Sequence, residues 1–155
     1  MGICRRMVAL SVLVAMWAPP AVAGDGNRVE RVSSAPFLLV AAALEQAVRD
    51  QGMTLVCRAN AQQGAAARGV RIPGNQVFFV FRNDFAVRLI DADPRAAYEA
   101  PIRIYLSETG DGRAAVSYVR PSALFQPYGH PEVTRVGAEL DPLLERIVAQ
   151  ALAAR

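Results

Sequence analysis

The chain has 155 residues, with 17 arginine, 14 acidic and one histidine side chains and no lysine. The absence of lysine excludes Schiff-base catalysis and a phosphate-loop site that depends on a lysine. The arginines do not cluster in the way that a nucleic-acid-binding surface requires, so we expect no nucleic-acid partner.

Residues 1–23 have the three-part pattern of a cleavable signal peptide. Arg5 and Arg6 precede an apolar run over residues 8–17, and the small residues Ala-Val-Ala follow at 21–23. The run is short for a transmembrane span, which needs about 20 residues, so the pattern favours cleavage over a retained anchor. We expect a periplasmic or secreted protein that has no membrane association after cleavage.

Residues 24–155 then form a single domain with 15 basic and 14 acidic side chains. This length is typical of one domain, and no linker or repeat divides it. The domain contains one cysteine, Cys57, which cannot form an intramolecular disulfide, so the fold must depend on its hydrophobic core. We expect no cofactor.

Hydrophobic periodicity predicts the elements of this domain in chain order. Ser34 is the expected N-cap of the first helix, and Gly52 is its stop. Pro142 is expected to kink or split the last helix, with Asp141 as a second cap. The predicted elements are strand 27–32, helix 34–52, strand 53–58, a short helix and loop within 60–74, strand 77–81, a helix capped at Asp84, strands 102–106 and 113–120, and helix 133–151.

This order of strands and helices predicts an α+β domain, with a mainly antiparallel sheet and helices packed on one side. The strand at residues 77–81 is apolar on both faces, which is typical of a central strand. Residues 109–112 are Thr-Gly-Asp-Gly, and they indicate a tight turn that joins the last two strands in a β-hairpin.

The predicted hairpin carries the candidate binding residues. A two-residue turn at Gly110-Asp111 or at Asp111-Gly112 gives the same faces, because the two registers differ by two residues. One face then holds Ile102, Ile104 and Leu106, and the other holds Arg103, Tyr105, Tyr118 and Arg120. Arginine and tyrosine together can bind an anion or a partner subunit. An ordinary solvent-facing sheet is the alternative.

Cys57 and His130 are the candidates for redox or metal chemistry. An exposed thiol is reactive, but Cys57 alternates with Leu55 and Met53, which favours a buried apolar position. His130 precedes the last helix and could serve as a base or a metal ligand. No second ligand accompanies it in the sequence, which favours a solvated loop residue.

Two carboxylate pairs, Asp91 with Asp93 and Glu108 with Asp111, are interpreted as turn and cap residues. The chain lacks the G-x-S-x-G, H-E-x-x-H and C-x-x-C motifs and the dinucleotide-binding glycine fingerprint. A hydrolase or transferase function therefore has little support.

The hairpin region contains PIRIYLSE at 101–108, Gly-Asp-Gly at 110–112, Val-Ser-Tyr at 116–118 and Pro121, preceded by Arg-Asn-Asp at 82–84 and Asp-Pro at 93–94. These residues resemble the core signature of the domain of unknown function 302 family. The resemblance extends over residues 29–153. It implies a small α+β domain that commonly dimerises and whose function is uncharacterised.

The chain departs from this family pattern at two places. Many members have Asn-Pro where this chain has Asn83-Asp84, and the exported branch often has Asp-His where this chain has Asn60-Ala61. An activity that needed this histidine is therefore not expected here.

Our leading hypothesis is an exported, non-enzymatic homodimer. It would bind a small anionic ligand or an envelope protein through the face that carries Arg103, Tyr105, Tyr118 and Arg120. The alternative is a periplasmic redox or metal-handling accessory protein that uses Cys57 and His130.

Overall fold

The computed structural model describes residues 26–155, so the predicted signal peptide at residues 1–23 lies outside the described residues. Five strands form one sheet in the order β1-β5-β4-β3-β2, and every neighbouring pair is antiparallel. The elements are β1 (Arg28–Pro36), α1 (Phe37–Asp50), β2 (Thr54–Asn60), α2 (Ala61–Ala66), β3 (Asn75–Phe81), α3 (Asn83–Ala92), η1 (Pro94–Glu99), β4 (Ile102–Glu108), β5 (Arg113–Val119), α4 (Pro121–Phe125), η2 (Gln126–Tyr128) and α5 (Pro131–Leu152). The predicted α+β class and the predicted order of elements are confirmed.

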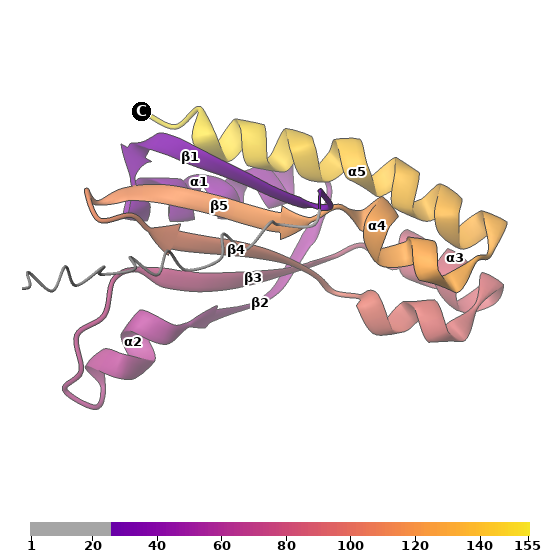
Figure 1. Cartoon of the computed structure of the whole chain (residues 1–155), viewed down its shortest axis with the longest axis horizontal. Coiled ribbons are helices and arrows are strands. Elements are labelled where there is room, and N and C mark those ends of the chain that lie inside the picture. Colours follow the sequence, from indigo (N-terminus) through magenta and orange to yellow (C-terminus); the bar gives the residue numbers. More distant parts are fainter. Residues whose placement is uncertain (1–25) are drawn as a thin grey trace, which may run out of the picture.

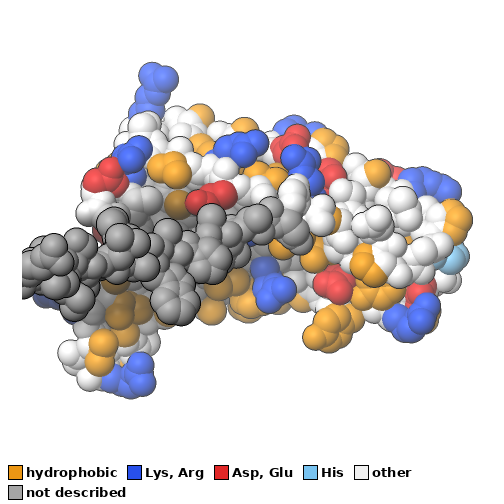
Figure 2. Space-filling model, viewed as in Figure 1, with side chains coloured by type: hydrophobic (Ala, Val, Ile, Leu, Met, Phe, Trp, Pro, Cys, Tyr) orange, Lys and Arg blue, Asp and Glu red, His pale blue; other side chains and the backbone are white. Residues whose placement is uncertain are grey.

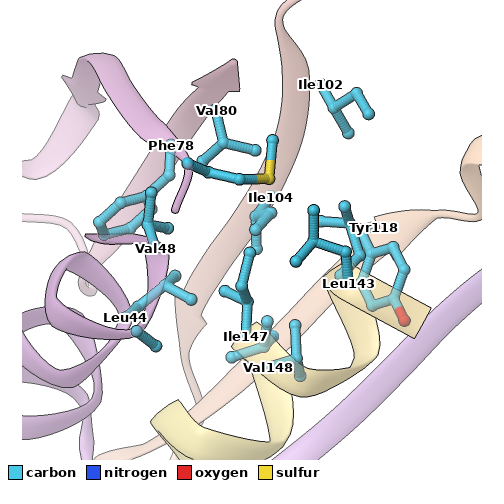
Figure 3. Close-up of a cluster of buried hydrophobic side chains, with 14 of the residues drawn as sticks. Leu44, Val48, Phe78, Val80, Ile102, Ile104, Tyr118, Leu143, Ile147 and Val148 are labelled. Atoms are coloured by element: carbon cyan, nitrogen blue, oxygen red, sulfur yellow. The ribbon is translucent and has the colours of Figure 1, made fainter. Parts of the chain in front are cut away.

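Helices α1 and α5 pack on one side of the sheet, and the hydrophobic core lies between the two layers (Figure 1). Alternate residues of β3, β4 and β5 point to this covered face, where they meet apolar residues of α1 and α5 (Figure 3). A fully buried aliphatic or phenylalanine side chain contributes about 1.5–3 kcal/mol. The buried side chains that Figure 3 labels are Leu44, Val48, Phe78, Val80, Ile102, Ile104, Tyr118, Leu143, Ile147 and Val148.

The first strand is longer than predicted, and this moves the start of α1. β1 extends to Pro36 and its pairing with β5 shifts register between Val32 and Pro36. Ser34 therefore lies in the strand and is not the helix N-cap; Pro36 occupies that position without a side-chain cap. The predicted stop is consistent with the structure, since Gly52 has φ of 70° immediately after the helix.

The central strand of the sheet is β4, and the prediction that the strand at 77–81 is central was wrong. β3 lies between β4 and the edge strand β2. Its uncovered side is apolar as well, because Val77, Phe79 and Phe81 lie there. These three side chains are half-buried. Asp84 also differs from the prediction, because it does not cap α3 and instead accepts hydrogen bonds from Arg82 at 2.8 and 3.0 Å.

The last helix runs without interruption through Pro142. Leu140, Leu143 and Leu144 are buried on both sides of the proline, and this packing outweighs its poor helix propensity. Asp141 was predicted to cap a second helix. Its carboxylate instead accepts hydrogen bonds from Ser122 at 2.9 Å (backbone N) and 2.6 Å (Oγ), which joins α4 to α5.

Candidate functional site

The β4–β5 hairpin turns through three residues, not through the predicted two. Tyr105 is opposite Ser117, and Glu108 is opposite Ala114. The Thr109 backbone N–H then donates to the Arg113 carbonyl at 2.8 Å, which leaves residues 110–112 as the loop. Gly112 supplies the left-handed conformation that such a loop needs, with φ of 80°. One extra loop residue moves every side chain of β5 to the other face.

The predicted common face of the four candidate residues is therefore wrong for two of them. Tyr118 lies on the covered face, only 4% exposed, and burial raises the pKa of its hydroxyl. Arg120 points to the helix side as well, where its guanidinium is 3.4 Å from the Glu145 carboxylate of α5. Arg103 and Tyr105 remain together on the uncovered face of the sheet.

A groove of about 330 Å³ lies on the uncovered face. The pairing of β4 with β5 ends at Tyr105 and Ser117, and beyond this point the two strands diverge toward η1 and α4 (Figure 1). The groove lies at this divergence. Its lining residues are Arg28, Val77, Arg103, Tyr105, Ser117, Tyr118, Val119 and Leu124.

Two arginines approach the groove from different strands. Arg28 begins β1, and its Nη2 donates to Ser117 Oγ at 2.8 Å, which places its charge over β5. Arg103 is exposed on β4. Within residues 26–155, neither guanidinium forms an ion pair with a carboxylate. Both charges are therefore available to an anion.

Two hydroxyl groups, on the paired residues Ser117 and Tyr105, lie beside these charges. Ser117 Oγ accepts from Arg28, and Tyr105 Oη accepts from Asn75 Nδ2 at 2.5 Å. A hydroxyl that accepts one hydrogen bond still has its own hydrogen to donate. Ser117 is only 3% exposed and anchors Arg28, whereas Arg28, Arg103 and Tyr105 present donors to the groove.

Glu30 is an acidic side chain at the margin of this site. It is opposite Ser117 in the β1–β5 ladder and lies on the same sheet face, but it does not line the groove. The side of the groove toward β1 therefore has a negative charge near it.

Cys57 is exposed, and its predicted buried position was wrong. The pairing of β2 with β3 shifts register between Leu55 and Cys57, which leaves Val56 as the extra residue of a bulge. Cys57 is opposite Phe79 on the uncovered face, and Phe79 is in turn opposite Arg103. The thiol thus belongs to the same face as the groove, outside its lining.

His130 is the N-cap residue of α5, where its Nδ1 accepts a hydrogen bond from the Glu132 backbone N–H at 3.2 Å. Cys57 is in the middle of β2, so the two candidates do not form one site. Residues 26–155 contain no group of three or more His, Cys, Asp and Glu side chains that could hold a metal ion.

Three carboxylates of the predicted pairs accept hydrogen bonds from backbone or side-chain groups. Asp93 caps η1 through the Arg95 backbone N–H, and the Arg95 guanidinium lowers the pKa of Asp93. Glu108 accepts from the Gly74 backbone N–H at 2.6 Å. Thr109 and Arg113 lower the pKa of Asp111 to about 2 by hydrogen bonds to its carboxylate. These contacts agree with turn and cap roles.

Comparison with known proteins places the chain in a family. The sequence profile described as "Domain of unknown function DUF302" matches residues 29–151. The chain belongs to the DUF302 family. A solved DUF302 structure, that of an uncharacterized conserved protein from Bacillus stearothermophilus, is similar with a TM-score of 0.72 and 12% identity, over 81% of this chain and 98% of that one. No curated protein matches the chain.

The similarity between the two DUF302 proteins shows the shared fold.

Charge on this DUF302 domain is mixed, with arginine and acidic side chains interleaved along the upper edge of Figure 2, where α5 runs. None of the helices in residues 26–155 has the length and apolarity of a membrane span.

Sequence reasoning missed Arg28 and Ser117. Arg28 joins the site only because β1 pairs with β5, where it is opposite Val119. Ser117 reaches the uncovered face only because the hairpin loop has three residues. Alternation of Arg28 with buried Val29 could have indicated that Arg28 faces away from the core, but not which strand lies beside it.

Proposed function

We propose that this DUF302 domain binds a small anionic ligand in the groove at the divergence of β4 and β5. The observation that carries the proposal is the pair of arginines, Arg28 and Arg103, in one groove without a carboxylate partner among residues 26–155. Arginine remains charged at any physiological pH and forms short, strong hydrogen bonds to oxyanions.

The size of the groove supports a small ligand. Pockets for small molecules have volumes of about 300–1,000 Å³, and this groove of about 330 Å³ is at the lower end of that range. Tyr105 adds a hydroxyl donor next to the two guanidinium groups, and Ser117 holds Arg28 in place, so a single oxyanion could receive hydrogen bonds from several directions.

The lining favours binding over catalysis. None of the lining residues is a histidine, cysteine, aspartate or glutamate. The lining itself therefore holds no general base that would activate a nucleophile, since Glu30, opposite Ser117, lies outside it. We accordingly propose a non-enzymatic role.

The test is an NMR titration with phosphate, acetate, gluconate and 2-naphthoate at low salt, using the protein recovered from cells that express the full chain. We expect at least one anion to bind, and Arg103→Gln to weaken that binding about tenfold or more, the typical loss of a hydrogen bond to a charged group. Arg120→Gln is the matched control, because Arg120 lies on the other face and should leave the affinity unchanged. No binding, or equal losses in both variants, would overturn the proposal.

We also propose that the domain acts outside the cytoplasm, on the basis of the signal-peptide pattern at residues 1–23. Intact mass measurement of the protein recovered from a periplasm tests this. A chain that starts at Gly24 supports export and cleavage after Ala23, and an uncleaved chain in the cytoplasm contradicts both.

Homodimerisation is a further proposal, and the resemblance to the family motivated it. Native mass spectrometry under reducing and non-reducing conditions separates the outcomes. A dimer that persists on reduction supports non-covalent assembly. A dimer lost on reduction points to an intermolecular disulfide through a cysteine, and a monomer in both conditions rejects the proposal.

A redox role for Cys57 is the second candidate function, because the thiol is exposed as that role requires. Alkylation of the native protein with iodoacetamide tests it. Failure of Cys57 to react would reject the redox role. A metal role has less support, since Cys57 and His130 lie apart.

A further inference from the structure

The side chains of the groove offer more hydrogen-bond donors than free acceptors. Its polar lining on the uncovered face consists of Arg28, Arg103, Ser117 and Tyr105. Arginine only donates, and each hydroxyl oxygen already uses one lone pair to accept a hydrogen bond, from Arg28 or from Asn75. No carboxylate, amide or imidazole side chain lines the groove.

This imbalance limits the ligands that the groove can bind. A ligand with several hydroxyl or amino groups would bring donors into a space whose side chains are mostly donors too. A polar group that is buried without a hydrogen-bond partner costs about 1–3 kcal/mol. Sugar phosphates, hydroxy acids and amino acids are therefore poor candidates, because their bodies carry several donors.

The rest of the lining is apolar. Val77 is opposite Tyr105 on the floor of the groove, Val119 lies between the strands that carry the two arginines, and Leu124 comes from α4 at the end of β5. An apolar body placed over these side chains would gain about 25 cal/mol for each Å² removed from water. A ligand that is only a charged group would leave this surface exposed.

The charges limit the ligand to one anionic group. Arg28 and Arg103 approach the groove from β1 and β4, on either side of β5, so one oxyanion in the groove can contact both guanidinium groups. Glu30 lies beyond Ser117 on the same face and would repel a second negative charge extended toward β1.

We infer that the groove takes a carboxylic acid with an apolar, unhydroxylated body, such as an aromatic or branched aliphatic monocarboxylate. This inference rests on the proposed anion site and specifies its ligand class. The carboxylate accepts hydrogen bonds from the guanidinium and hydroxyl groups, and the body covers Val77, Val119 and Leu124.

The experiment compares four probes by NMR titration of the full chain at low salt. The probes are 2-naphthoate, its neutral amide 2-naphthamide, gluconate as a carboxylate with a hydroxylated body, and inorganic phosphate as a charge without a body. We expect 2-naphthoate to bind at least about tenfold more tightly than each of the others, since one unsatisfied donor or one lost charged hydrogen bond is worth that much.

A variant sharpens the test. Val119→Thr keeps the shape and the strand propensity of the residue but replaces a methyl group with a hydroxyl, which is also an acceptor. We expect a severalfold weaker affinity for 2-naphthoate and an unchanged or stronger affinity for gluconate. Urea unfolding of the variant verifies that the domain remains folded.

The outcomes separate the inference from the proposal on which it rests. If gluconate or phosphate binds as tightly as 2-naphthoate and Arg103→Gln weakens that binding, the anion site holds and the ligand class is wrong. If 2-naphthamide binds as tightly as 2-naphthoate, the charge has no role and both are overturned. If no probe binds, both are overturned as well.

Discussion

The two faces of the sheet are made of alternate residues of the same strands, yet they have opposite chemistry. The covered face presents Phe78, Ile104 and Val116, all of which are inaccessible to solvent. The uncovered face presents Phe79 and Arg103, one residue along each strand from a core position. One face therefore determines stability, and the other is free to present a cationic groove. The comparison teaches that stability and the proposed anion binding should respond to separate substitutions in this domain.

The largest expected contrast is between two neighbouring phenylalanines. Phe78→Ala leaves a cavity in the covered face and should lower the free energy of unfolding by about 3–5 kcal/mol. Phe79→Ala removes a half-buried ring from the uncovered face and should cost less than half as much. Urea denaturation measures both. Equal losses that depend on protein concentration would break the comparison, because they would show that a second chain buries the uncovered face.

A smaller contrast separates helices that pack against the core from one that does not. A Cβ at Gly137 of α5 would lie 2.9 Å from Ser122 Cα of α4, whereas a Cβ at Gly64 of α2 would meet nothing within 4 Å. Gly137→Ala should therefore destabilise the domain by about 1–3 kcal/mol through overpacking. Gly64→Ala should stabilise it by up to about 1 kcal/mol, the difference in helix propensity. Thermal unfolding of both variants measures this, and a stabilised Gly137→Ala would contradict the close α4–α5 contact.

Cys57 can report the charge of the uncovered face. The thiol is two strands from Arg103, about 10 Å at ordinary strand spacing. At low salt, Arg103→Gln should slow the reaction of Cys57 with the dianionic 5,5′-dithiobis(2-nitrobenzoate) up to about fourfold, since one charge at this distance in water changes the energy of a dianion by about 0.8 kcal/mol. The rate with neutral 4,4′-dithiodipyridine should change less.

The measurement uses the Cys4→Ser background, so that only one thiol reacts. Arg120→Gln, on the covered side, should leave both rates unchanged. Equal slowing with both reagents would indicate a change in access to the thiol and not in charge.

The smallest expected effect concerns the β4–β5 hairpin, whose loop length determines which residues of β5 lie on each face of the sheet. Thr109 and Arg113 lower the pKa of Asp111 to about 2 from its ordinary value of 3.8. Its carboxylate therefore stabilises the fold above about pH 4. The contribution disappears as the pH falls toward 2, where the carboxyl is protonated in the folded state too. The difference in unfolding free energy between the wild type and Asp111→Asn should shrink over this range; a difference independent of pH would refute the role of the ionised carboxylate.

The sequence was sufficient to predict the order of the helices and strands and the position of the middle residues of most of them. The helical spacing of Val40, Leu44 and Val48 predicted α1, and the alternation of Ile102, Ile104 and Leu106 predicted β4. These patterns are visible because periodicity follows directly from burial on one side. Pro142 misled the prediction because packing against the core outweighs local propensity.

The site was harder to predict because single residues decide it. The third residue of the hairpin loop turned Tyr118 toward the helix-covered face of the sheet and Ser117 toward the uncovered face. The bulge at Val56 turned Cys57 outward. Neither event changes the composition or the periodicity of the neighbouring residues. Arg28 depended on a pairing between distant strands, which one sequence does not reveal.

The groove depends on the strand whose pairing spans the longest stretch of chain. The ladders β2–β3, β3–β4 and β4–β5 each join strands that are consecutive along the chain, whereas β1 pairs only with β5, which places Arg28 opposite Val119. Contacts between distant residues pay the larger loop-closure entropy, so we expect β1 to dock late in folding and to open first in local unfolding. Opening of β1 would remove Arg28 from the groove while the ladders among β2–β5 stay paired. An anion bound to Arg28 in the groove would then disfavour the opening of this edge strand. Slower hydrogen exchange of the β1 amides in the presence of the anion would reveal it.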